Sequence, residues 1–201
     1  MDNQVLKIIR NIPVTMGVVM GVTIISISAN LIGTSAMQLL GLSPATISLR
    51  TLFTMVTYAF LHADIVHWFF NTCWLVAFGL LLEPRIGSLR TGLLMFMGTL
   101  AFSLSMVMFD KSPPVLVMGC SGAAYSLLAA YALILYRTFK TLATWEKVTG
   151  LILVLLPILG LLSSMMHPIG RGRLLSSVVG VIIMFVYISL TKEIIELKQK
   201  C

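Results

Sequence analysis

Apolar residues fill most of six stretches of this chain, and short polar or charged stretches separate them. The six stretches cover about 12–33, 57–82, 91–109, 116–136, 148–165 and 174–190. A helix that crosses a bilayer needs about 20 mainly apolar residues, so each stretch is close to one span in length. None shows the ten-residue alternation of a barrel strand, and helices satisfy their own backbone in lipid. We therefore predict an all-α, six-span membrane protein that forms a single domain over 1–201.

The composition supports this interpretation. Apolar residues make up 58% of the 201 residues, charged residues make up 10%, and the mean hydropathy is +1.01. Average soluble domains carry about 25% charged residues. These values exclude a soluble globular domain, a disordered chain and any sizeable extramembrane catalytic domain. The three cysteines, Cys73, Cys120 and Cys201, are too scattered for a disulfide framework or a zinc site.

The positive charge is unevenly distributed along the chain. With six spans both termini lie on one side, and ten of the fourteen Lys and Arg residues fall on that side. The positive-inside rule then places both termini in the cytoplasm. The net charge of +7 is explained by this topology and requires no nucleic-acid partner. The first stretch, which follows Lys7 and Arg10, is predicted to be an uncleaved span.

Three polar residues near the start of the second stretch are not explained by burial in a membrane. His67 and Asn71 are four residues apart and share one helix face, and His62 precedes His67 by five residues. Ionisable and polar groups in a membrane are costly to desolvate, so they are candidates for function. His67 and Asn71 can both donate hydrogen bonds toward one place near the non-cytoplasmic surface. The alternative is a helix-packing pair.

A small-residue motif opens the fourth stretch. Gly119 and Gly122 allow a close approach of the backbone, and Ser121 lies at a predicted helix start, where free N–H groups favour an anion. The oxyanion formed when a serine attacks a peptide carbonyl is such an anion. Tyr125 follows by one turn and is expected above the same site. The proline-broken segment 113–118 is predicted to approach Ser121 as a non-helical loop, whereas the alternative for the motif is plain helix packing.

Together these features resemble the rhomboid family of intramembrane serine proteases. The resemblance extends from Arg50 to at least Ala129 and rests on the order of the motifs in a six-span chain. It implies that Ser121 is the nucleophile and that His67, Asn71 and the Ser121 backbone N–H form the oxyanion hole. It also implies a membrane-spanning substrate segment, unwound near the outer face, and no metal or cofactor. The matching residues are Arg50, His62, His67, Asn71, the run Glu83 to Ser88, Gly119, Ser121, Gly122 and Tyr125.

The chain departs from the family pattern at the residue that takes the serine proton. Rhomboids use a histidine near the start of span six, three and seven residues before small residues. Ser176 and Gly180 are such small residues, and both counts lead back to Arg173. An arginine has no lone pair available at neutral pH, so it cannot act as the base. His167, in the preceding loop, is a candidate base at another register, although it also fits a solvated loop residue.

Two functions follow from this pattern. The first is an intramembrane serine endopeptidase, favoured by Ser121, His67 and Asn71. The second is an inactive rhomboid-like protein that binds transmembrane helices and controls their fate, favoured by Arg173. The expected partners are transmembrane segments and the lipid bilayer. A chain of this length suits a bacterial inner membrane, and an organelle membrane is the alternative.

Overall fold

A computed structural model of the chain describes residues 10–44, 48–109 and 116–164, together with residues 174, 175, 178, 179 and 182. Within these ranges the chain is helical and forms no strand beyond one bridge between Leu42 and Val117. The helices are α2 (Pro13–Ile32), α3 (Thr34–Leu40), α4 (Leu49–Thr57), α5 (Ile65–Ile86), α6 (Ser88–Phe109), α7 (Ser121–Thr138) and α8 (Thr144–Ser164), with 3₁₀ turns at Tyr58–Phe60 and Phe139–Thr141. His167, Arg173 and most of the predicted sixth span lie outside the described residues.

Three of the described helices are long and apolar enough to cross a membrane, namely Pro13–Ile32, Ile65–Ile86 and Ser88–Met108. Large apolar side chains on these helices are also exposed on the outside of the bundle. Leu31 is 84% exposed and Phe70 is 57% exposed. Apolar surface of this extent is unusual for a soluble monomer and is what a lipid-facing helix presents. The chain is therefore a membrane protein, while the total of six spans stays a prediction.

For two of the six stretches, the helix in the structure begins later than the sequence predicts. The second stretch is expected from residue 57, but α5 begins only at Ile65, where Asp64 caps it. Thr57 instead ends α4, Tyr58–Phe60 form a 3₁₀ turn, and residues 61–64 are non-helical. It also continues past residue 82 to Ile86 and ends at Gly87, whose φ is +85°. The fourth stretch was expected from residue 116, but α7 begins at Ser121. Residues 116–120 are non-helical, as predicted for the approach to Ser121.

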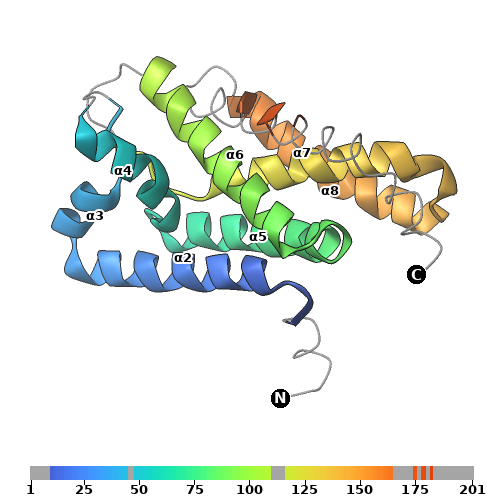
Figure 1. Cartoon of the computed structure of the whole chain (residues 1–201), viewed down its shortest axis with the longest axis horizontal. Coiled ribbons are helices and arrows are strands. Elements are labelled where there is room, and N and C mark those ends of the chain that lie inside the picture. The colour runs from blue at the N-terminus through green and yellow to red at the C-terminus, as the bar shows by residue number, and fades with distance from the viewer. Residues whose placement is uncertain are drawn as a thin grey trace.

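Helix α7 forms the centre of the described bundle and packs against α5, α6 and α8 (Figure 1). Its contact with α6 is close because both helices have small residues there. A Cβ added to Gly122 would lie 2.7 Å from the Cβ of Phe102 and 2.8 Å from the Gly98 carbonyl oxygen. One turn later, Ser126 donates a hydrogen bond of 2.6 Å to the carbonyl of Leu94. Gly122 therefore has a packing role between α7 and α6.

Helix α2 lies beside α5 in Figure 1, and a buried carboxylate joins the two. Glu83 is 2% exposed, and its oxygens accept hydrogen bonds from the backbone N–H groups of Val14 and Thr15, each at 2.9 Å. The Thr15 hydroxyl donates a third bond of 2.7 Å. These N–H groups belong to the first turn of α2, where Ile12 provides no side-chain cap. A carboxylate at this position satisfies the free donors and complements the helix dipole.

We expect the Glu83→Gln substitution to lower the free energy of unfolding by roughly 2–3 kcal/mol, because bonds to a charged acceptor contribute about 1.5–3 kcal/mol each and an amide replaces one acceptor oxygen by a donor. Equilibrium unfolding in mixed micelles measures this change. The matched control is Glu146→Gln, whose carboxylate accepts one exposed bond from the Ala143 N–H. Equal losses in the two variants would contradict the assigned role of Glu83.

Candidate active site

The first turn of α5 fixes the position of His67. The Asp64 carboxylate accepts a hydrogen bond of 2.7 Å from the backbone N–H of His67, which is the usual contact of an N-cap side chain. His67 and Asn71 then project from successive turns of the same helix face. The spacing of four residues, read from the sequence, thus corresponds to two neighbouring side chains near the start of α5.

Gly119 brings the segment before α7 into contact with these two side chains. Its φ is +118°, a conformation that glycine adopts readily. A Cβ added at this position would lie 2.7 Å from Cε1 and 2.8 Å from Nε2 of His67, and 3.2 Å from Nδ2 of Asn71. The N–H of Gly119 donates a bond of 3.1 Å to the carbonyl of Tyr58. Two side-chain nitrogens therefore lie against the backbone two residues before Ser121.

Ser121 is the first residue of α7 and is 6% exposed. The preceding residue, Cys120, provides no side-chain cap to this helix. The N–H groups of the first turn have no partner within a helix, and the positive end of the dipole lies there. A hydroxyl, two polar nitrogens and a helix N-terminus consequently gather around one stretch of backbone. This combination suits a reaction in which negative charge develops on an oxygen.

His62 is buried just before α5 and contacts Asn71. Its Nε2 lies 3.1 Å from Nδ2 of Asn71, its ring meets the His67 ring edge to face at 5.0 Å between centroids, and it is 2% exposed. The pKa of His62 is lowered to about 4, chiefly by burial and also by the imidazole of His67, while the carboxylate of Asp64 opposes these two effects. His62 is therefore neutral at pH 7. A neutral imidazole retains one nitrogen that accepts a hydrogen bond.

The other residues singled out in the sequence lie in different surroundings. Tyr125 donates a bond of 3.1 Å from its hydroxyl to the carbonyl of Pro157, so it links α7 to α8. Gly122 faces α6, as described above. His167 and Arg173 are outside the described residues, so the base proposed from the sequence has no described position.

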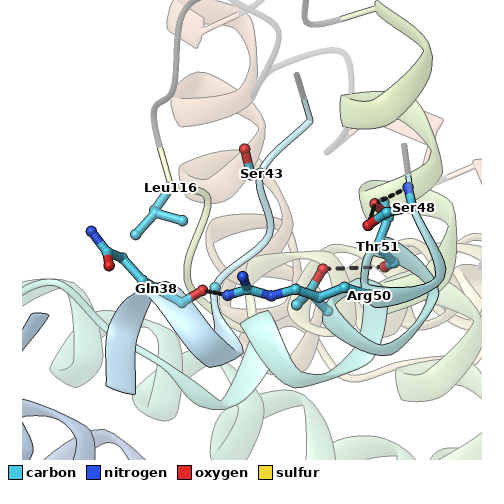
Figure 2. A pocket seen from close by; sticks show the side chains of 8 residues that line it. Gln38, Ser43, Ser48, Arg50, Thr51 and Leu116 are labelled. Atoms are coloured by element: carbon cyan, nitrogen blue, oxygen red, sulfur yellow. Dashed lines mark hydrogen bonds between the residues drawn. The ribbon is translucent and has the colours of Figure 1, made fainter. Parts of the chain in front are cut away.

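Arg50 supports the region next to the site. Its guanidinium donates a hydrogen bond to the carbonyl of Gln38, which joins α4 to α3 across a cavity of about 400 Å³ (Figure 2). Leu116 also lines this cavity, and the adjacent Val117 exchanges two backbone bonds with Leu42, of 2.8 and 3.2 Å. These contacts hold the segment that leads to Ser121 against the α3–α4 region.

Sequence reasoning missed two residues of this site. Asp64 has an available signal, because an aspartate immediately before an apolar helical run is a usual N-cap. Ser26 of α2 contacts the ring of His62. Its sequence signal is weak, since Ser26 and Asn30 are simply two polar residues one turn apart in an apolar helix.

Comparison with known proteins gives two findings. The family model described as Rhomboid domain matches residues 49–190, which is more than half of the chain. Rhomboid-related protein 3 from Homo sapiens is 37% identical over 76 residues, or 38% of this chain. The match covers 18% of that human protein, so the chain spans a small part of its relative. The similarity to a human protein lends no support to the bacterial membrane expected above.

Proposed function

Since the chain belongs to the rhomboid family, we propose that it is an intramembrane serine endopeptidase that cleaves transmembrane segments of other membrane proteins near the non-cytoplasmic face. The observation that carries the proposal is the contact of Gly119 with His67 and Asn71. It puts two side chains able to stabilise an oxyanion next to the segment that ends in Ser121. A packing pair alone would not require an open helix N-terminus and a serine at the same place.

In the proposed reaction the Ser121 hydroxyl gives its proton to a base while Oγ bonds to the substrate carbonyl carbon. The carbonyl oxygen becomes an oxyanion, and His67, Asn71 and the Ser121 N–H donate hydrogen bonds to it. The peptide C–N bond then breaks as the base returns the proton to the leaving amine. Water hydrolyses the acyl-enzyme in the same way. We propose His167 as the base, and no metal or cofactor is needed.

The membrane topology proposed for this function has six spans with both termini in the cytoplasm. The distribution of Lys and Arg supports it. A second support is that α5 and α7 are the second and fourth predicted spans, which enter the membrane from the same side in this topology. The contact of Gly119 with the first two turns of α5 agrees, because it joins the beginnings of the two helices. The sequence left a bacterial inner membrane and an organelle membrane as alternatives, and the similarity to a human protein favours the organelle membrane.

The test is labelling of the detergent-purified protein with a fluorophosphonate, which forms a bond from Ser Oγ to phosphorus and releases fluoride. Labelling of the native chain supports the proposal. Native protein that is folded and stays unlabelled, under conditions that label an active serine hydrolase, contradicts it.

The alternative function is an inactive member that binds transmembrane helices, and Arg173 favours it. We expect Arg173→His to raise the labelling rate by about tenfold or more, because a positioned imidazole base typically contributes 10²–10⁴-fold. Labelling that appears only in this variant would assign the native chain to the inactive class. Unchanged labelling in folded protein would show that the register leading to Arg173 is wrong.

A further inference from the structure

A chain of hydrogen bonds starts at Ser26 in α2 and ends at Asn71. The Ser26 hydroxyl lies 2.9 Å from the carbonyl oxygen of Phe60 and 3.2 Å from Nδ1 of His62. A carbonyl oxygen only accepts, so the single hydroxyl proton of Ser26 points to Phe60. The Ser26 oxygen can then only accept from His62, and the proton of this neutral imidazole is placed on Nδ1.

The position of that proton decides the orientation of the Asn71 amide. With Nδ1 protonated, Nε2 of His62 carries a lone pair and accepts a hydrogen bond. The Asn71 atom that lies 3.1 Å from Nε2 of His62 must therefore be a donor, which is the amide nitrogen Nδ2. Nδ2 carries two protons, so one N–H remains after the bond to His62. Nδ2 is also the Asn71 atom that would lie 3.2 Å from a Cβ on Gly119.

The opposite orientation of the amide would be harmful to the proposed reaction. It would place the carbonyl oxygen of Asn71 beside Gly119, where it repels an oxyanion instead of binding it. The other imidazole tautomer, with its proton on Nε2, favours this orientation because it presents a donor to Asn71.

The other groups around His62 agree with a lone pair on Nε2, because the group nearest to it after Asn71 is also a donor. The Cys120 sulfur lies 3.7 Å from Nε2, and a thiol is a weak donor. Ser26, His62 and Asn71 are 4%, 2% and 8% exposed, so water has little access to replace a lost partner. The Asn30 amide donates to the carbonyls of Ser26 (2.8 Å) and His62 (3.3 Å), which fixes the backbone of both residues.

We propose that Ser26 is a positioning residue: through His62, it fixes the orientation of the Asn71 amide and so prepares the oxyanion hole from a helix outside the catalytic motifs. This inference rests on the proposed function for its effect on the reaction. The hydrogen-bond relay itself, from Phe60 through Ser26 and His62 to Asn71, is a property of the folded chain and can be tested without activity.

The first test is nuclear magnetic resonance of the purified chain labelled with [¹⁵N]histidine. The chain has three histidines, and His62→Gln assigns the signal of His62. We expect neutral His62 with its proton on Nδ1 at pH 7, and a shift of the proton toward Nε2 in Ser26→Ala. A proton on Nε2 in the native chain overturns the proposal whether or not the protein is an enzyme.

The second test separates the binding and reaction steps of fluorophosphonate labelling. We expect Ser26→Ala to lower kinact by about tenfold with KI within twofold, which is less than the 10²–10³-fold cost of removing an oxyanion donor outright. Ser26→Thr retains the hydroxyl and should restore most of kinact, whereas Ser28→Ala, on the exposed face of α2, should behave as the native chain.

The outcomes of the two tests distinguish the two proposals. An unchanged kinact in folded Ser26→Ala overturns the positioning role. If the native chain is not labelled, the proposed function is contradicted. The tautomer of His62 then decides by itself whether the hydrogen-bond relay exists. A retained unfolding midpoint shows that an altered kinact does not come from loss of the fold.

Discussion

The Ser121→Ala chain is expected to lose cleavage of a co-expressed single-span substrate, and to lose fluorophosphonate labelling, by a factor on the order of 10³ or more. The variant lacks the oxygen that would bond to the carbonyl carbon, and nothing else in the proposed reaction replaces it. Ser121 is small and nearly buried, so alanine fits its place at the start of α7. Protein levels and the unfolding midpoint should therefore stay near those of the native chain.

The control for this prediction is Ser28→Ala, which removes an exposed hydroxyl from α2 and leaves α7 intact. Cleavage and labelling should be unchanged in it. Should Ser121→Ala cleave and label as well as the native chain, the assignment of Ser121 as nucleophile would be wrong.

Gly119→Ala is expected to reduce labelling by at least about 100-fold, the cost of losing an oxyanion-hole donor. The new methyl group would lie 2.7 Å from the ring of His67 and would push that ring or the Asn71 amide away. The φ of +118° adds backbone strain, because residues with a Cβ rarely adopt it. The unfolding midpoint should fall as well, but a folded fraction should remain that labels poorly.

A matched glycine separates this local effect from a general one. A Cβ at Gly17 in α2 meets nothing within 4 Å, so Gly17→Ala should leave labelling unchanged and should not lower stability. Labelling of folded Gly119→Ala within threefold of the native rate would mean that the contact of Gly119 with His67 and Asn71 has no part in the reaction.

The helical architecture could be predicted well because hydropathy is decisive in this chain. The span expected at 12–33 corresponds closely to α2, and that at 91–109 corresponds to most of α6. The errors occur where a local contact overrides hydropathy. Apolar residues continue from Tyr58 through Leu61, yet α5 begins only at Ile65, after the Asp64 cap. Hydropathy ends the second stretch just before Glu83, yet the bonds of Glu83 to the first turn of α2 allow it to be buried inside α5.

The candidate site was only partly readable for a related reason. His67 and Asn71 stand four residues apart in one helix, so their shared face follows from local geometry. Ser26 belongs to another helix, and its link to His62 joins positions 36 residues apart in the chain. The spacing of residues along one helix does not indicate which residue of another helix they contact, so this pair could not be predicted.

The membrane class, the order of the motifs, the helix start at Ser121 and the arginine at position 173 could all be read from the amino-acid sequence. These depend on composition, on spacing along one helix and on the chemistry of single side chains. Which residues of different helices meet follows instead from how the helices pack in the folded chain. The contact of Gly119 with α5, the pairing of Glu83 with α2 and the relay from Ser26 to Asn71 arise when helices distant in sequence pack together, and the donors and acceptors brought together there must match.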